Sequence, residues 1–158
     1  SKKAEAWYQN DKLYRKGDLP SKIIYYENGK LRRTIWKTGD NIHRDNDLPA
    51  GIDYYENGKK NQEIWFVNNE YYRAVKPAVI VYDENENKRK EIWYNEPGKN
   101  VRKDKLPIKI CYFGNGNRHI EVWLENNTTK NIFFHKDGSK KSERWYDDKH
   151  VLINTISY

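Results

Sequence analysis

Apolar positions along the chain recur with a long and regular spacing. The six tryptophans, Trp7, Trp36, Trp65, Trp93, Trp123 and Trp145, are separated by 29, 29, 28, 30 and 22 residues. Thirteen residues before each of the last five stands an isoleucine, and two residues after that an aromatic, as in Ile23 and Tyr25. An apolar pair spaced by two residues indicates a strand with one face toward a core. Self-similarity at this period predicts tandem units.

Turn residues follow the same period. Eight residues before each later tryptophan stand Asn28, Asn57, Asn85, Asn115 and Asp137, and the next residues are Gly29, Gly58, Glu86, Gly116 and Gly138. Asn-Gly and Asp-Gly predict two-residue hairpin turns in which both central residues have positive φ. Glu86 departs from this pattern and predicts a turn of another type or length. A second turn follows each tryptophan, and beyond it we expect a short strand ending in arginine and a link containing proline.

These patterns predict an all-β fold, because no stretch has a helical period. We expect an elongated antiparallel meander of tandem β-hairpin repeats, in which each hairpin is buried mainly against its sequence neighbours. Residues 1–158 are expected to form a single repeat domain of five units and a partial sixth. The units begin near the tryptophans, and we number them 1 (Trp7), 2 (Trp36), 3 (Trp65), 4 (Trp93), 5 (Trp123) and 6 (Trp145, partial).

The segments Trp36–Ala50 and Tyr54–Lys59 resemble MORN-type repeats, and more closely the divergent long variant of about 29 residues that is common in large DNA viruses with AT-rich genomes. The resemblance covers about residues 5–158. It implies a MORN-like hairpin array, often with an aromatic-lined groove, that contacts protein or lipid, and a viral factor that docks a host or viral partner. Standard MORN units are shorter and rich in Gly-x-Gly, whereas this chain has 9 glycines in total, so lipid contact is not expected.

Composition adds a basic and aromatic character to this picture. Aromatic residues make up 15% of the chain and hydrophobic residues 36%, which favours a thin structure built around rings. The net charge of +7 permits contact with nucleic acid, anionic lipid or an acidic protein. With the single cysteine Cys111, no internal disulfide forms, and a reducing compartment is expected. No apolar run or signal region suggests export, so we expect an intracellular, cytoplasmic protein (host cytoplasm if viral), not a secreted one.

We call residues that recur at the same position of successive units a column. Two columns are candidates for binding, and each also has a structural interpretation. The tryptophans are either a platform for ligands or the hydrophobic spine that joins the units. The arginines either bind phosphate or carboxylate groups of a partner in a bidentate manner, or they have a structural role. In the structural role they stack on neighbouring rings or pair with Glu63, Glu91 or Glu121. The candidate binding residues are Arg15, Arg44, Arg73, Arg102, Tyr26 and Tyr55.

Nothing in the pattern indicates catalysis. The four histidines, His43, His119, His135 and His150, occupy unrelated columns, so metal-ligand spacing is absent, and we predict no catalytic residue, metal or cofactor. We therefore expect a non-enzymatic scaffold for protein–protein interaction. The alternative is nucleic-acid binding through a basic, Tyr-rich sheet face, and the distribution of cations over the two sheet faces discriminates between them. Membrane contact is not expected, and the sequence leaves the oligomeric state open.

Overall fold

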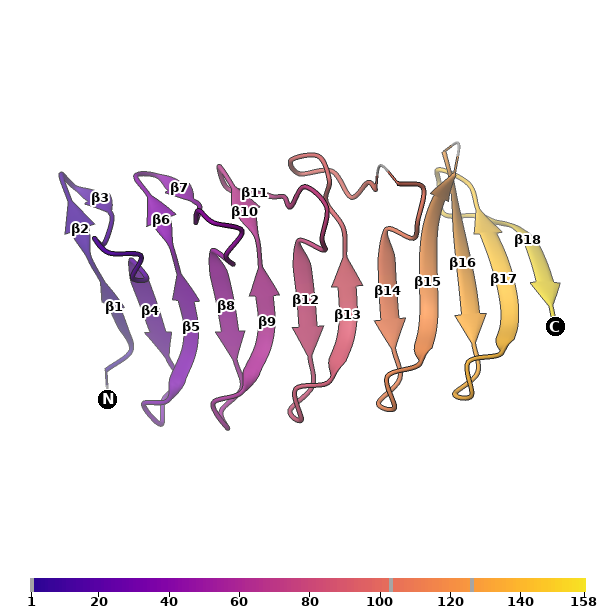
Figure 1. Ribbon diagram of the computed structural model, residues 1–158, viewed down its shortest axis with the longest axis horizontal. Coiled ribbons are helices and arrows are strands. Elements are labelled where there is room, and N and C mark those ends of the chain that lie inside the picture. Colours follow the sequence, from indigo (N-terminus) through magenta and orange to yellow (C-terminus); the bar gives the residue numbers. More distant parts are fainter. Residues whose placement is uncertain (1, 103, 126) are drawn as a thin grey trace.

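A computed structural model describes residues 2–102, 104–125 and 127–158, and the described residues form strands, turns and irregular segments without a helix. Twelve strands form one antiparallel sheet in the order β1-β4-β5-β8-β9-β12-β13-β14-β15-β16-β17-β18. Successive strands of the sheet follow one another along the chain, and the sheet is long and one layer thick (Figure 1). The prediction of an elongated all-β antiparallel meander is confirmed.

The strands of this sheet are three to five residues long up to β14 and six to eight residues long from β15 on. They are β1 (Ala4–Ala6), β4 (Lys22–Tyr25), β5 (Leu31–Ile35), β8 (Gly51–Tyr54), β9 (Lys60–Ile64), β12 (Val79–Tyr82), β13 (Lys88–Ile92), β14 (Lys109–Tyr112), β15 (Arg118–Glu125), β16 (Thr128–Phe134), β17 (Lys140–Tyr146) and β18 (Leu152–Ser157). Three two-stranded ribbons lie outside it: β2 (Tyr8–Gln9) with β3 (Lys12–Leu13), β6 (Lys37–Thr38) with β7 (Asn41–Ile42), and β10 (Phe66–Val67) with β11 (Glu70–Tyr71).

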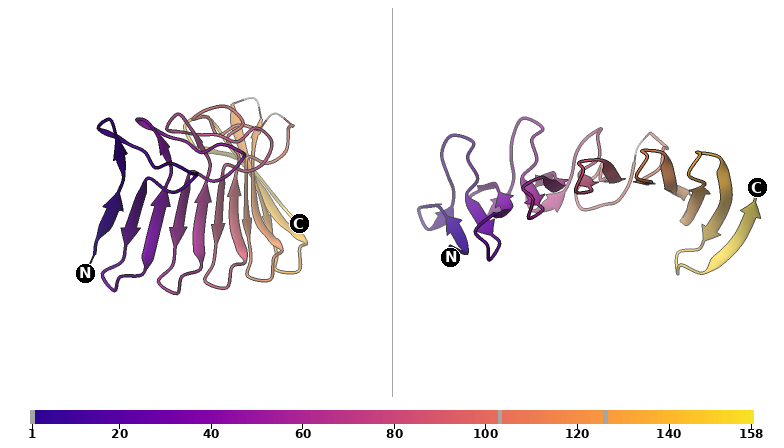
Figure 2. Two further views of the ribbon diagram at one scale, coloured as in Figure 1. Left: turned by 60° about the vertical axis from the view of Figure 1, so that its left-hand side comes forward. Right: turned by 90° about the horizontal axis from the view of Figure 1, so that it is seen from below.

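Two kinds of connection alternate along the sheet. Tight turns join the strands at one long edge, and at the other edge longer segments, which we call links, follow the first four tryptophans, whereas β15 and β17 continue through Trp123 and Trp145 (Figure 1). The two-stranded ribbons belong to the links of units 1 to 3. Seen from below, the links project to one side of the sheet (Figure 2, right). The link-bearing edge and the turn-bearing edge therefore offer different surfaces.

The tight turns differ from the predicted type. Gly29 N–H donates to the Tyr26 carbonyl at 3.0 Å, and Tyr26 N–H donates to the Lys30 carbonyl at 2.8 Å. Gly29 has φ +82°, whereas Asn28 is not among the described residues with positive φ. This is a three-residue loop with a left-handed third residue, accompanied by a bulge between Ile24 and Tyr25. The prediction of two central residues with positive φ was wrong, because Asn-Gly also fits a turn that needs only the glycine in that region.

Glu86 forms the same turn as the glycines. Its N–H donates to the Asp83 carbonyl at 2.9 Å, Asp83 N–H donates to the Asn87 carbonyl at 2.9 Å, and its φ is +67°. The expectation of another turn type or length was wrong, since the hydrogen bonds of the hairpin hold Glu86 in a strained left-handed conformation. Two-residue turns with two positive φ angles occur in links instead, at Asn68 (51°) and Asn69 (71°).

One row of paired residues runs across the whole sheet. Its members, in spatial order, are Glu5, Ile23, Thr34, Ile52, Glu63, Ile80, Glu91, Ile110, Glu121, Ile132, Glu143 and Ile156. We call it the Ile–Glu row. The tryptophans lie two residues after the glutamates and therefore on the same face, which we call the Trp face. Most members from Thr34 to Glu143 are buried, so carboxylates alternate with aliphatic side chains in the thin core.

Each of three central glutamates in this row is satisfied by two partners. Glu63 Oε2 accepts from the Tyr82 hydroxyl at 2.7 Å, and Glu63 Oε1 pairs with Lys60 Nζ at 2.6 Å. The same pair of partners is Tyr112 and Lys88 for Glu91, and Tyr158 and Lys140 for Glu143. Glu121 pairs with Arg118. A buried carboxylate with an ion pair and a hydroxyl donor is compensated for its loss of water. The expected pairing of Glu63, Glu91 and Glu121 with the arginine column is not observed.

Candidate binding site

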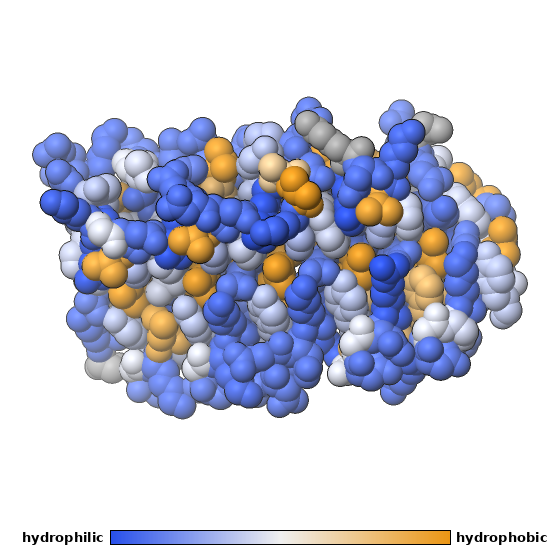
Figure 3. All heavy atoms as spheres, viewed as in Figure 1, coloured by the Kyte–Doolittle hydropathy of each residue, from blue (hydrophilic) through white to orange (hydrophobic). Residues whose placement is uncertain are grey.

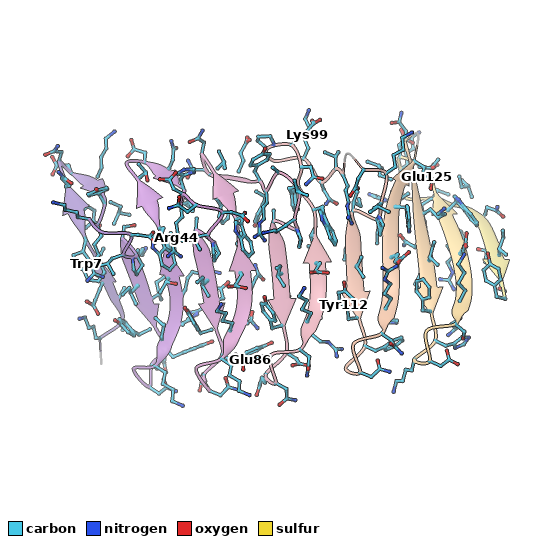
Figure 4. All side chains as sticks on the ribbon, in the orientation of Figure 1. Trp7, Arg44, Glu86, Lys99, Tyr112 and Glu125 are labelled. Atoms are coloured by element: carbon cyan, nitrogen blue, oxygen red, sulfur yellow. The ribbon has the colours of Figure 1, made fainter. Side chains whose placement is uncertain are left out.

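The predicted arginines lie in the links and cover the tryptophan rings. The Arg44 guanidinium carbon is 3.9 Å from the centre of the Trp36 ring, and that of Arg73 is 3.8 Å from the centre of Trp65. The same contact joins Arg15 to Trp7 at 3.7 Å and Arg102 to Trp93 at 4.1 Å. Figure 4 shows Arg44 over the strands, whereas Glu86 lies at the turn edge. Of the two readings of this column, the ring-stacking geometry is therefore the one observed.

Two of these arginines also join successive units. Arg73 Nε and Nη2 contact the two carboxylate oxygens of Asp47, in the preceding link, at 2.6 and 2.8 Å. Its Nη1 donates to the Pro77 carbonyl at 3.3 Å. Arg44 makes the equivalent contacts to Asp18 and the Pro49 carbonyl. Such bidentate pairs are geometrically specific, so each arginine fastens its own link to the link before it.

The two aspartates have altered acidity. The hydrogen bond from Arg73, followed in size by that from Lys76, lowers the pKa of Asp47 to about 2. The hydrogen bond from Arg44 likewise lowers the pKa of Asp18. Desolvation opposes both shifts but is outweighed, because an adjacent guanidinium stabilises the ionised carboxylate. The carboxylates of Asp18 and Asp47 are therefore ionised at neutral pH.

The tryptophans also take part in these contacts between successive units, which we call joints. Trp65 is only 7% exposed and packs with Ala78 and Ile80, and its indole N–H donates to the Asp47 backbone carbonyl at 2.9 Å. Trp36 donates in the same way to the Asp18 carbonyl at 3.1 Å. These contacts use both the rings and the indole donors to connect neighbouring units. They favour the spine over the ligand platform for Trp36 and Trp65.

The predicted tyrosines lie at the opposite edge. The Tyr26 hydroxyl donates to the Tyr54 carbonyl at 2.6 Å, and the Tyr55 hydroxyl donates to the Tyr82 carbonyl at 2.8 Å. The structure therefore brings the four arginines to the link edge and the two tyrosines to the turn edge, and does not gather all six into one site. The side-chain donors of Arg44, Arg73, Tyr26 and Tyr55 are used within the chain, and a role in partner binding stays a prediction.

The joint between units 4 and 5 lacks this arrangement. Lys105 occupies the position of Asp18 and Asp47 there. Arg102 belongs to the preceding joint, at Trp93, where Val75 stands at the aspartate position, and it pairs with Asp104 in its own link, with 2.8 Å between Nε and Oδ1. Unit 5 is only 22 residues long and contributes no arginine to cover Trp123. The nearest cation to its ring is Lys130, whose Nζ lies 5.3 Å from the ring centre and pairs with Glu125 at 3.1 Å.

A cleft of about 520 Å³ lies at this joint, and we call it the Trp123 cleft. Its apolar lining includes Trp123, Ile108, Leu106 and Leu124, and its charged lining is Arg102, Lys105 and Glu125. Leu106 and Leu124 are 46% and 49% exposed. The corresponding clefts at Trp36 and Trp65 are smaller, at about 190 and 280 Å³, and are lined by the arginine and aspartate of the joint.

The surface around the clefts is otherwise mixed. In the view of Figure 3, hydrophobic residues form small separate patches between hydrophilic ones. Lys105 is exposed, and in the part of the chain that the structure describes no carboxylate lies within ion-pair distance of it. Leu19, which lines the cleft at Trp36, is also 48% exposed, so the Trp123 cleft is distinguished by its larger volume and by Lys130 as the cation nearest its indole ring. Sequence reasoning did not identify this cleft, although the short unit 5 and the change from aspartate to Lys105 were signals for it.

Among the described residues, no three His, Cys, Asp or Glu side chains gather in a way that would hold a metal ion. Since these residues contain no helix, none is present there that is long and apolar enough to cross a membrane. Comparison of the chain with protein-family models, curated proteins and solved structures returns no match.

Proposed function

We propose that the chain is a non-enzymatic tandem-repeat scaffold that mediates protein–protein interaction, and that a partner segment binds in the Trp123 cleft. The observation that carries this proposal is the missing arginine cover. At Trp36 and Trp65 a guanidinium lies over the ring and a carboxylate secures it, whereas no arginine of the described residues lies over Trp123 and the cleft there is larger. Exposed apolar surface beside an indole is typical of interface anchors.

The lining of the cleft selects the chemistry of the partner. An apolar side chain on Trp123, Leu106 and Leu124 removes exposed apolar surface from water. Arg102 and Lys105 flank this surface, and Glu125 is already paired with Lys130. The cleft therefore suits an extended acidic peptide segment that carries a leucine or aromatic side chain next to an aspartate or glutamate. Charge complementarity of this kind supports specificity and rate of association.

Selection of random peptides on the immobilised protein tests this proposal. Enriched peptides should combine acidic residues with leucine or an aromatic residue. Measured by fluorescence polarisation, their affinity should fall at least about tenfold in Lys105→Glu and Leu124→Asp, a loss of about 1.4 kcal/mol. Lys16→Glu, in the link of unit 1, makes the same charge change away from the cleft and should alter affinity less than about twofold.

Unfolding midpoints of the three variants establish that each is folded. Peptides without acidic residues, or equal losses in Lys105→Glu and Lys16→Glu, would contradict the assignment of the cleft.

A further inference from the structure

The sheet face opposite the Ile–Glu row carries more cations than carboxylates. Strand alternation places Lys22, Arg33, Lys90, Lys109 and Arg144 on this face, and Asp53 is the one acidic residue at the corresponding positions of the described strands. We call it the basic face. Asp53 is engaged by Arg33, with 2.8 Å between Nη2 and Oδ2. On the Trp face, by contrast, Lys60, Lys88, Arg118 and Lys140 are each paired with a glutamate.

A cavity of about 290 Å³ lies between the turn ends of β14 to β17. Its aromatic lining includes Phe113, Phe133 and His119, and its cations are Lys136, Lys141 and Arg144. The rings of Phe113 and His119 are tilted by 33° with their centres 4.3 Å apart, and the Arg144 guanidinium carbon lies 5.1 Å from the centre of Phe133. We call it the Phe113 pocket. It combines flat apolar walls with three positive charges.

The cations of the Phe113 pocket have no acidic partner. Across the described ranges, no carboxylate lies within ion-pair distance of Lys136, Lys141 or Arg144. The nearby Asp137 accepts from the Ser139 N–H and hydroxyl at 2.9 and 2.7 Å, as part of its own turn. Three like charges around one cavity repel one another, and an anionic ligand would relieve that repulsion.

The earlier turns lack this character. At the position of Lys136, the first three turns carry Glu27, Glu56 and Glu84, and the fourth carries Gly114. Without a side chain at Gly114, the Arg89 guanidinium comes within 3.2 Å of where its Cβ would lie. This position of the turn therefore changes from glutamate in the first three turns to glycine in the fourth and lysine in the fifth.

We propose that the Phe113 pocket and the basic face bind single-stranded nucleic acid. An unpaired base stacks on the rings of Phe113 and Phe133, and the adjoining phosphates contact Lys136, Lys141 and Arg144. The strand then continues over Lys109 and Lys90. Aromatic stacking beside a row of cations is how proteins bind single strands without reading their sequence. A duplex does not present a free base face to the pocket, and an acidic peptide uses the cations but not the rings.

This proposal is independent of the Trp123 cleft, because it uses other residues on the opposite face. The probe is a fluorescein-labelled twelve-residue oligothymidylate, followed by fluorescence anisotropy at two salt concentrations. Affinity should fall steeply between about 50 and 200 mM salt, since each phosphate contact releases counterions. The double variant Lys141→Gln/Arg144→Gln should lose at least about tenfold in affinity. Lys30→Gln/Lys59→Gln, which removes the same charge from two exposed turns of units 1 and 2, should lose less than about twofold.

A second variant separates base stacking from general attraction to polyanions. Phe113→Leu keeps an apolar side chain but removes the ring, and should weaken oligothymidylate binding about fivefold or more. Its binding of polyglutamate should be unchanged. The proposal is overturned if the oligothymidylate does not bind, if the two charge variants lose equally, or if polyglutamate binds as tightly while Phe113→Leu has no effect. The last result would assign the basic face to an acidic protein.

Discussion

The joints at Trp65 and Trp123 occupy equivalent places on the Trp face but differ in how they are closed. At Trp65 the ring is covered by Arg73, the arginine is held by Asp47, and the indole donates to a backbone carbonyl. At Trp123 no arginine of the described residues lies over the ring, the indole donates to the Glu121 carboxylate at 3.1 Å, and the adjacent link carries Lys105. Three residues from two units close the joint at Trp65, whereas unit 5 lacks the link that would supply the arginine, and a cleft lies there.

This contrast teaches that equivalent positions of the chain close a joint where the pattern is complete and leave an open cleft where it is broken, and the open cleft is the one that we propose for binding. A nearest-neighbour array draws its stability from contacts between adjacent units. A unit that gives up those contacts leaves apolar and charged groups exposed, and these are the groups that a partner needs. The turn edge shows a parallel change, since the Tyr26 and Tyr55 hydroxyls tie successive hairpins together while Phe113 instead lines a cavity.

The largest expected effect is the loss of the Trp65 ring. Trp65→Ala should lower the free energy of unfolding by about 3–5 kcal/mol, because it empties a buried site and leaves Arg73 without its ring. Trp123→Ala should cost about half as much, since its ring is only partly buried. Urea denaturation of both variants checks this, and equal losses would abolish the distinction between the joints.

The next effect concerns the arginine fork. Arg73→Gln should lower the free energy of unfolding by about 2 kcal/mol, because it removes a stacked cation and the bidentate partner of Asp47. Arg102→Gln should cost less, because Arg102 pairs with Asp104 within its own link and does not bridge two links. Urea denaturation of these two variants measures the difference. A larger loss in Arg102→Gln would show that bridging successive links is not what the fork contributes.

A smaller effect is expected in acid. The pKa of Asp47 is about 2 in the folded chain, below the usual value of about 3.9 for an unfolded aspartate. Its stabilisation is therefore complete above about pH 4 and is lost as the pH falls through about 2. Allowing for solvent screening of a half-exposed carboxylate, the loss should be about 1 kcal/mol. Urea denaturation at several pH values should show a shallower acid decline in Asp47→Asn, and an unchanged decline would exclude this carboxylate as a cause.

The smallest effect concerns the third turn. Glu86→Gly should raise the free energy of unfolding by about 0.5–1 kcal/mol, because glycine adopts a φ of +67° without strain. Gly58→Ala, at the equivalent position with φ +87° and open space around its Cβ, should lower it by a similar amount. Thermal unfolding of the pair tests the conformation directly, since no side-chain contact is lost at Gly58. A destabilised Glu86→Gly would mean that Glu86 contributes contacts beyond its backbone.

The strands could be predicted because the alternation of Ile23 and Tyr25, repeated along the chain, is a local signal. The turn type could not, since Asn-Gly is compatible with either loop length and the bulge depends on pairing. The glutamates two residues before five of the six tryptophans were visible, but their isoleucine neighbours required the register between strands. The Trp123 cleft exists because unit 5 lacks the segment that carries the arginine and the proline, and a missing segment offers no residue pattern from which to predict a cleft. The Phe113 pocket is built from three hairpins, so no single segment encodes it.

The central claim is that the missing arginine cover makes Trp123 accessible. Hydroxyl-radical footprinting followed by mass spectrometry measures the oxidation rate of each tryptophan in the folded chain. We expect Trp123 to be oxidised several times faster than Trp65 and Trp93, which are 7% and 5% exposed and lie under Arg73 and Arg102. Equal rates for the three tryptophans would contradict the account.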